Sequence, residues 1–256
     1  MRFFTLYSGS GGNATYIESG ETAILIDAGK NAKRLCSALT EIGSSIDKID
    51  AIFITHDHAD HTSALEILAK KHDIPIHITK KSAEVFEGER YSVLREHLVL
   101  HPPLFEVEIG TFRVRSFPTP HDSRMSVGYR IDIDGGYSVG VATDLGHVSD
   151  AVSEALHGCG AVMLESNHDT DMLESGPYPA FLKQRILSRR GHLSNPDSAL
   201  FAARLAASGT RSFLLAHLSA ENNTPSLALD EFISAVADPT VKVSVADAER
   251  PTEMYL

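Results

Sequence analysis

A short segment rich in histidine and aspartate is the feature of this sequence with the clearest chemical potential. Residues 56–61 read HDHADH and directly follow an apolar run. A spacing of two places His56 and His58 on the same side of an extended segment. Asp60 and His61 come where the chain is expected to turn into a helix, so they can face a second position nearby. Because imidazole and carboxylate groups bind zinc and similar divalent metals, we predict a two-position metal site rather than a plain surface cluster.

Three further side chains of metal-ligand type each follow an apolar run that we expect to form a strand. They are His121 after residues 112–117, Asp144 after residues 139–142, and His217 after residues 213–216. Each of them alone would more often be an ordinary loop or core residue. Because all three occupy the same position relative to a strand, we expect them to meet residues 56–61 at one edge of the sheets.

Residues 175–196 reverse the sign of the charge that the rest of the chain carries. This segment contains Lys183, Arg185, Arg189, Arg190 and His192 without any acidic residue, whereas the whole chain has a net charge of −11. Basic side chains near a metal site favour an anionic substrate such as a phosphodiester. A solvated basic helix face is the alternative interpretation of the segment alone.

The composition of the 256 residues is typical of a globular protein. Apolar residues make up 43% and charged residues 22%, and no apolar run is long enough to predict a membrane span. Cys36 and Cys159 lie outside any CxxC pattern, which argues against a thiolate zinc site or a disulfide framework. The negative net charge argues against non-specific coating of nucleic acid. The apolar run at the N-terminus is too short for a secretory signal, so we expect a cytoplasmic protein.

The expected elements place the candidate ligands at the ends of strands. Residues 98–141 look like a run of strands, and strands are predicted at 16–18, 23–26, 51–54, 112–117, 127–133, 138–141, 161–164, 213–216 and 241–245. Helices are predicted at 30–42, 62–72, 149–157, 196–207 and 226–237, with Thr62 or Ser63 as the N-cap of the second. The strand-rich middle does not fit one open parallel sheet. We therefore predict an α/β protein with two stacked sheets and outer helices, forming a single domain over residues 1–256.

The order HxHxDH, then His, Asp and His, resembles the metallo-β-lactamase superfamily. Five further stretches are similar to the YycJ (WalJ) family within it: SGSGGN at 8–13, ATDLGH at 142–147, LESNH at 164–168, RGHLSN at 190–195 and HLSAENN at 217–223. The resemblance extends over essentially the whole chain. It implies the four-layer αββα sandwich of the metallo-β-lactamase fold.

The resemblance also implies which residues bind metal. His56, His58 and His121 would hold the first ion, Asp60, His61 and His217 the second, and Asp144 would bridge both. Two ions ~3.5–4 Å apart share a water and lower its pKa, so the nucleophile implied is a bridging hydroxide that Asp60 orients. Zinc is the expected metal, with manganese or iron as alternatives. Asp57 is a candidate acceptor for the second ring nitrogen of a ligand histidine.

A Glu and a later Gly-His are paired in phosphodiesterase branches such as ribonuclease Z, and Glu165 with His192 resembles this pair. The resemblance implies that His192 contacts the scissile phosphate or protonates the leaving oxygen, while Glu165 holds its imidazole. The other expected substrate contacts are Arg189, Arg190, Asn13 and His168. The YycJ family is associated with nuclease activity on DNA. A DNA phosphodiesterase of exonuclease type is therefore the expected function, with nucleic acid as the partner.

Two other functions remain open from the residues. A hydrolase of thioesters, lactones or amides on the same scaffold would need neither the basic segment nor the Glu165–His192 pair. A non-catalytic metal-binding or regulatory protein is the other, and seven filled ligand positions argue against it. The chain has no tryptophan and no aromatic-rich stretch that would predict a platform for base stacking. It also lacks a long inserted arm for gripping tRNA, which argues against ribonuclease Z function.

Overall fold

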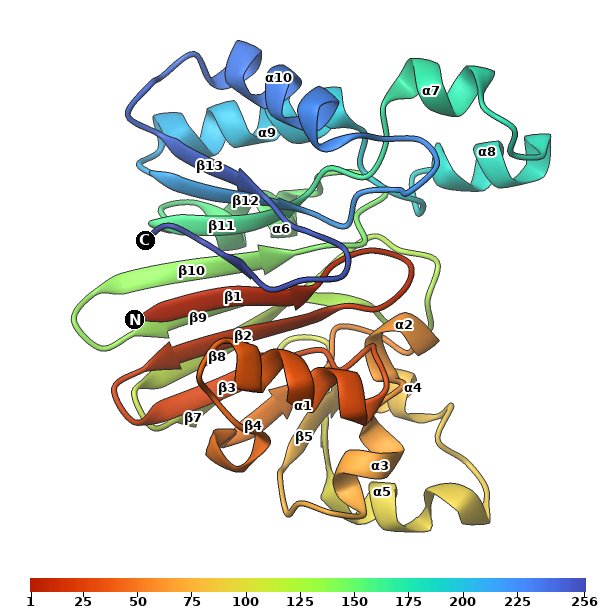
Figure 1. Cartoon of the computed structure of the whole chain (residues 1–256), viewed down its shortest axis with the longest axis vertical. Coiled ribbons are helices and arrows are strands. Elements are labelled where there is room, and N and C mark those ends of the chain that lie inside the picture. The colour runs from red at the N-terminus through yellow and green to blue at the C-terminus, as the bar shows by residue number, and fades with distance from the viewer.

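The central strands carry apolar side chains on both faces, which requires a covering layer on each side. All 256 residues are described by a computed structural model, in which Ile24 and Ile26 pack between two sheets. Leu25, between them in sequence, packs against helices instead. In the other sheet Leu214 faces the space between the sheets and Phe213 faces helices. The result is the predicted αββα sandwich, in which two sheets lie between two helical layers (Figure 1).

Each sheet has seven strands and combines antiparallel with parallel pairing. The order of the strands in the first sheet is β14 (Thr252–Glu253), β1 (Arg2–Tyr7), β2 (Ala14–Ser19), β3 (Thr22–Ile26), β4 (Ala51–Phe53), β5 (Ile76–Thr79) and β6 (Leu98–His101). Neighbouring strands are antiparallel from β14 to β3 and parallel from β3 to β6. The second sheet is parallel as far as its fourth strand and antiparallel beyond it; its order is β13 (Lys242–Val245), β12 (Ser212–Ala216), β11 (Ala161–Glu165), β10 (Tyr137–Ala142), β9 (Val127–Ile133), β8 (Phe112–Pro118) and β7 (Glu106–Ile109).

The helices form two groups that follow the order of the chain. On the side of the first sheet lie α1 (Ala32–Glu41), α2 (Ala59–Thr62), α3 (Leu65–Ala69), α4 (Lys80–Ala83) and α5 (Ser92–His97), with short 3₁₀ turns at Ile46–Lys48 and Glu89–Tyr91. On the side of the second sheet lie α6 (Asp150–Leu156), α7 (Thr170–Ser175), α8 (Ala180–Ile186), α9 (Asn195–Ala207) and α10 (Pro225–Val236). None of these helices has the length and apolar character needed to span a bilayer.

Most predicted elements are present, with one difference that bears on chemistry. The helix predicted at 62–72 starts earlier and is divided into α2 and α3. Thr62 and Ser63 are therefore not N-caps, since the Thr62 hydroxyl donates to the carbonyl of His58 from inside the helix. Helices α7 and α8 were not predicted, because residues 169–186 show no strong apolar periodicity. In Figure 1 these two helices protrude beyond the sandwich.

Two hydrogen bonds between the sheets hold the start of the HDHADH segment. The buried Tyr129 hydroxyl of β9 donates to the carbonyl of Ile54 at 2.6 Å, just beyond β4. The amide of Val127, in the same strand, donates to the carbonyl of Thr55 at 3.0 Å. The loop that carries His56 is therefore tied to both sheets, which limits how far its side chains can move relative to the second sheet.

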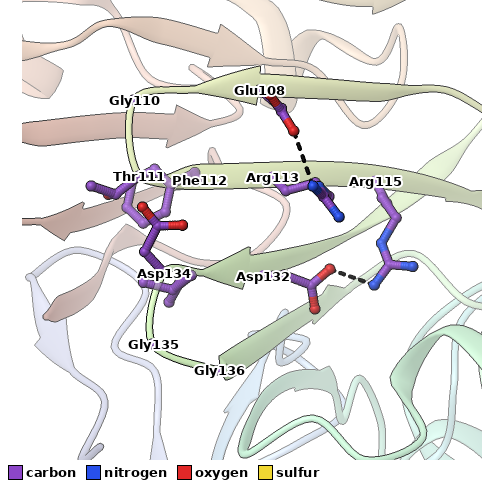
Figure 2. Close-up of a pocket in the computed structure, with 11 residues that line it drawn as sticks. Glu108, Gly110, Thr111, Phe112, Arg113, Arg115, Asp132, Asp134, Gly135 and Gly136 are labelled. Carbon is purple, nitrogen blue, oxygen red and sulfur yellow. Dashed lines mark hydrogen bonds and ion pairs between the residues drawn. The ribbon is translucent and has the colours of Figure 1, made fainter.

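The largest hollow in the surface, of about 620 Å³, lies at the far end of the second sheet from this loop. It surrounds the turns that begin β8 and end β9, and charged side chains line it (Figure 2). Arg113 bonds to Glu108 at 3.1 Å, and Arg115 pairs with Asp132. These charges therefore pair with one another across an open sheet surface.

The hydrogen bond from the Tyr129 hydroxyl to the carbonyl of Ile54 should contribute measurably to the stability of the protein. We expect Tyr129→Phe to lower the free energy of unfolding by about 1–3 kcal/mol, because the buried carbonyl of Ile54 loses its donor. Urea unfolding followed by circular dichroism measures this change. Tyr137→Phe, on the partly exposed Tyr137 of the neighbouring strand β10, is the matched control and should change stability by less than about 0.5 kcal/mol. Equal stability of the two variants would contradict a structural role for the bond.

Candidate metal centre

Seven side chains from four strand ends meet at one edge of the sandwich. The HDHADH segment connects β4 to α2, His121 follows β8, Asp144 follows β10, and His217 follows β12. Strands β8, β10 and β12 run in the same direction within the second sheet, so their carboxyl ends share one edge. The convergence expected from the sequence is therefore present, and it brings together residues up to 161 positions apart, from His56 to His217.

The side-chain atoms form two adjacent groups of three. In each group the nitrogen and oxygen atoms that could bind metal lie within 4.8 Å of one another. The first group is His56, His58 and His121, and the second is Asp60, His61 and His217. Within the first group the His56 Nε2 and His58 Nδ1 atoms face each other at 3.0 Å.

Asp144 lies between the two groups. Its Oδ2 atom is 3.4 Å from the Nε2 atom of His61 in the second group. Its Oδ1 atom is 3.6 Å from Nε2 of His121 in the first group and 3.7 Å from Nε2 of His217. A carboxylate in this position lies within reach of ions at both groups.

Three of these buried atoms have no hydrogen-bond partner within the protein. They are Nε2 of His121, Nε2 of His217 and Oδ2 of Asp144, on side chains that are at most 3% exposed. Buried polar atoms without a partner are rare, because each loses its hydration without compensation. Divalent cations between these atoms would satisfy all three, and the imidazole and carboxylate donors suit zinc, manganese or iron. The residues present therefore fit a pair of metal ions.

Hydrogen bonds on the opposite ring nitrogens orient the ligand histidines. The Nδ1 atom of His61 lies 2.8 Å from Oδ2 of the buried Asp27, which follows β3. Asp27 also accepts the amide and hydroxyl of Thr55, whose oxygen lies 3.0 Å from Nδ1 of His56. Both rings are thereby turned so that the opposite nitrogen, Nε2, faces the centre, where it is free to bind a metal.

The remaining anchors come from Glu165 and Gly191. Glu165, at the end of β11, is fully buried and places Oε1 2.9 Å from Nδ1 of His217 and 2.8 Å from Nδ1 of His192. Its other oxygen accepts the amides of Leu145 and Leu193. The carbonyl of Gly191 faces Nδ1 of His121 at 3.1 Å. One carboxylate thus orients a ligand of the centre together with the neighbouring His192.

Backbone strain is concentrated at the same edge. The non-glycine residues with positive φ are Asp27 at 64°, Asp144 at 59°, His217 at 58° and Ala237 at 50°. The left-handed region disfavours side chains and is occupied where the surroundings over-determine the conformation, often at functional sites. Three of these four residues lie at the centre; Asp27 and His217 directly follow a strand, and Asp144 comes two residues after one. The strain turns their side chains from the strand direction into the site.

The carboxylates give the centre a strong preference for positive charge. Burial lowers the pKa of His61, yet Asp27 and Asp144 raise it to about 10. Burial alone would raise the pKa of Asp144, but His217, His61 and His56 hold it well below its ordinary value. The cluster therefore keeps Asp144 ionised and attracts cations, whether protons on the imidazoles or metal ions between them.

The expected substrate contacts occupy different positions around the centre. Arg189 and Arg190 line a hollow of about 310 Å³ beside His121, together with Arg124 and His147. The guanidinium of Arg190 also braces the loop after β8, donating to the carbonyls of His121 at 2.9 Å and Ser123 at 3.3 Å. Arg189 contacts Nε2 of His147 at 2.8 Å and is otherwise exposed.

Asn13 and His168 do not lie where a substrate contact is expected. The amide nitrogen of Asn13 lies 3.0 Å from Nε2 of His61 and 3.3 Å from Oδ2 of Asp60, so it steadies the ligands. The backbone of Asn13 also forms hydrogen bonds with the backbones of Asp60 and Gly29. Only glycine fits at position 29, because a Cβ on this residue would lie 1.5 Å from the carbonyl oxygen of Asp60. His168 is 1% exposed and lines neither hollow beside the centre.

The suggested role of Asp57 is wrong. Its carboxylate accepts the amide of Arg124 at 3.2 Å and pairs with that guanidinium at 3.6 Å, so it orients no ligand histidine. Asp27 orients His61 instead, and the sequence argument missed it. The signal was present, since Asp27 follows a strand in the same way as Asp144 and His217 do.

The chain is similar in sequence to one family of known domains and to several individual proteins. Residues 22–218 match the family described as the β-lactamase superfamily domain. The chain is 35% identical over 249 residues to the exodeoxyribonuclease WalJ of Streptococcus pneumoniae serotype 2 (strain D39 / NCTC 7466), covering 96% of this chain and 91% of that protein. It is 34% identical over 237 residues to the exodeoxyribonuclease YycJ of Bacillus anthracis, covering 89% and 86%.

Among solved structures, the fold is similar to that of the metallo-β-lactamase fold protein YhfI from Bacillus subtilis. The TM-score is 0.74 at 19% sequence identity, and the match covers 98% of this chain and 99% of that chain. At this identity the likeness shows the shared sandwich and nothing about substrate.

The contact between Asp27 and His61 predicts a loss of metal affinity when it is weakened. We expect Asp27→Asn to lower the affinity for divalent metal by roughly 10–100-fold, because His61 loses its charged acceptor. Competition with a chromogenic chelator measures the affinity. Asp57→Asn is the matched control, since Asp57 faces Arg124, and it should bind metal as the wild type does. A greater loss in Asp57→Asn than in Asp27→Asn would show that the anchor is misassigned.

Proposed function

We propose that this chain, a metal-dependent hydrolase that belongs to the metallo-β-lactamase superfamily and to its YycJ family, is an exonuclease that hydrolyses DNA phosphodiesters with two divalent ions. The observation that carries the proposal is the ring of His192, which Glu165 holds beside the ligand atoms of both ion positions. His192 is an imidazole in addition to the five that are proposed to bind metal, so it can donate a proton. This suits an anionic substrate with a poor leaving group.

The proposed ligands are the seven residues that meet at the sheet edge. His56, His58 and His121 would hold one ion, Asp60, His61 and His217 the other, and Asp144 both. When bound, two divalent ions supply an activated water and neutralise charge on the phosphate oxygens in the transition state. Zinc is the metal that five histidines and two aspartates suit best, with manganese or iron as alternatives. Asp60, the most exposed of the acidic ligands, is placed to orient the attacking water.

His192 is the proposed acid for the leaving oxygen. Its Nδ1 atom bonds Glu165 at 2.8 Å, which leaves Nε2 for the substrate. The ring centroid lies 5.2 Å from those of His121 and His217, so a phosphate at either ion position is within reach. His192 can therefore contact the scissile phosphate or donate a proton to the oxygen that leaves. A positioned imidazole of this kind contributes about 10²–10⁴-fold in rate.

DNA is the proposed substrate because cations lie beside the centre in an otherwise acidic chain. Arg189 and Arg190 are exposed residues that line the hollow beside His121. They are placed to contact phosphates flanking the one that is cut. The relatives named exodeoxyribonucleases support the same substrate class. Cys36 and Cys159 are both free thiols, which supports the cytoplasm as the proposed location.

The ligand assignment predicts a metal content. We expect the purified protein to carry about two divalent ions per chain, measured by inductively coupled plasma mass spectrometry. His58→Ala removes one ligand of the first group and should lower this content toward one ion. His157→Ala, at an exposed histidine outside the site, should retain the wild-type content. Wild-type protein that binds no metal and remains inactive with added zinc, manganese or iron would overturn the assignment.

The catalytic assignment predicts how activity divides among substrates and variants. Metal-loaded protein should cleave single- or double-stranded DNA and bis-p-nitrophenyl phosphate. His192→Ala should lower kcat by about 10²–10⁴-fold without changing metal content, because the acid is lost and the ligands remain. Asp60→Ala should abolish cleavage, whereas His157→Ala should leave it unchanged. Efficient hydrolysis of thioesters or lactones with no diester cleavage would reject the nuclease in favour of an acyl hydrolase.

A further inference from the structure

A separate small cavity adjoins the candidate centre on the side of the protruding helices. It has a volume of about 150 Å³ and reaches His192 and His217 at its inner end. Its outer wall is formed by Tyr178, Leu182 and Ile186, from α8 and the segment before it. We call this space the ring pocket. Tyr178, Leu182 and Ile186 take no part in the proposed metal binding or in orienting the proposed ligands, unlike His217 and Gly191 at the inner end.

The size and lining of the ring pocket suit one planar ring. A cavity of about 150 Å³ has room for a single ring of the size of benzene. Here Tyr178, Leu182, Ile186 and Leu218 form the apolar part of the wall, and the polar part includes the hydroxyls of Ser10 and Ser219 and the ion pair of Arg185 with Asp122. Hydroxyls both donate and accept hydrogen bonds, so they can meet the edge of any nucleobase without selecting one.

The backbone on both sides of Tyr178 is restricted, which favours a stacking contact with its ring. Tyr178 stands between Pro177 and Pro179, which restrict the backbone on either side, and its side chain is half-buried. An aromatic ring fixed in this way binds with little loss of conformational freedom. The exposed ion pair of Arg185 with Asp122 joins α8 to the loop that carries His121, which keeps the wall beside the centre.

We propose that the ring pocket receives the unpaired base of the nucleotide that is being released from a DNA strand, stacked on Tyr178; this rests on the proposed nuclease function. The pocket opens beside His192, so a base within it belongs to a nucleotide next to the scissile phosphate. Side chains from several segments of the chain line a space about one ring in size, which excludes a stacked base pair. The terminal base must therefore leave the duplex before its phosphodiester is cut, which favours release of nucleotides from an end.

Oligonucleotides with a missing terminal base test this proposal directly. Single-stranded DNA with an ordinary terminal nucleotide is compared with DNA whose terminal nucleotide is a tetrahydrofuran abasic analogue, placed at the 5′ end in one set and the 3′ end in another. For wild type we expect kcat/KM to be roughly tenfold higher with the ordinary end that is attacked, the size of one base–aromatic stacking contact. The abasic end lacks the ring but retains every phosphate.

Variants of the wall separate a base contact from a general effect on the fold. Tyr178→Ala should lower kcat/KM for the ordinary end by a similar factor and leave the abasic end unchanged, whereas Tyr178→Phe should retain the preference. Leu182→Trp fills the pocket and should remove the preference as well. Phe181→Ala is the matched control, because Phe181 lies on the same helix, is 72% exposed and does not line the pocket.

The outcomes distinguish this inference from the function on which it rests. Equal kcat/KM for ordinary and abasic ends in the wild type would overturn the ring pocket and leave the nuclease intact. An equal loss on both substrates in Tyr178→Ala would also overturn it, since that pattern indicates a structural role. Absence of cleavage of any DNA by the metal-loaded wild type would reject the nuclease and the ring pocket together.

Discussion

A buried carboxylate stays ionised only when donors surround it, and the site depends on how Glu165 meets this condition. Burial raises the pKa of Glu165, but His192 and His217 lower it to about 2. Its two oxygens accept from these two imidazoles and from the amides of Leu145 and Leu193. The donors come from loops after β10 and β12 and from the segment after α8. One charge therefore fixes three loops, a proposed metal ligand and the proposed acid relative to one another.

The sandwich makes this arrangement possible because its parallel strands end at a common edge. β11 and β12 pair with Glu165 opposite Ala216, so the residue after β12 is His217, directly beside the carboxylate. In the first sheet β3 and β4 are also parallel neighbours, and Asp27 after β3 reaches Thr55 after β4. Both sheets thus use the same device, in which a buried carboxylate at one strand end orients an imidazole that follows the next strand.

The ligands could be predicted from the sequence because their signals are local. HDHADH has a fixed spacing, and His121, Asp144 and His217 each follow an apolar run. The anchors could not be assigned in the same way, since the contact of Asp27 with His61 spans 34 residues and depends on which strands are neighbours. Asp57 is adjacent in sequence to His56 and His58, but alternation along an extended loop turns it away from the centre, toward Arg124. Strand order is the information that the sequence pattern lacks.

The segment 169–192 shows a second limit of what a sequence pattern can predict. It also contains side chains that we propose contact the substrate. Helices α7 and α8 contribute little to the three main apolar clusters of the sandwich, so burial imposes no periodicity that would predict them. Their side chains are free to serve a ligand instead, and this segment supplies Tyr178, Leu182 and the cations near His192. The strand ends of the sandwich position the proposed metal ligands. The segment 169–192 adds Tyr178 and Leu182 beside His192 and Arg189 and Arg190 in the hollow beside His121, and these are the side chains that we propose contact the substrate.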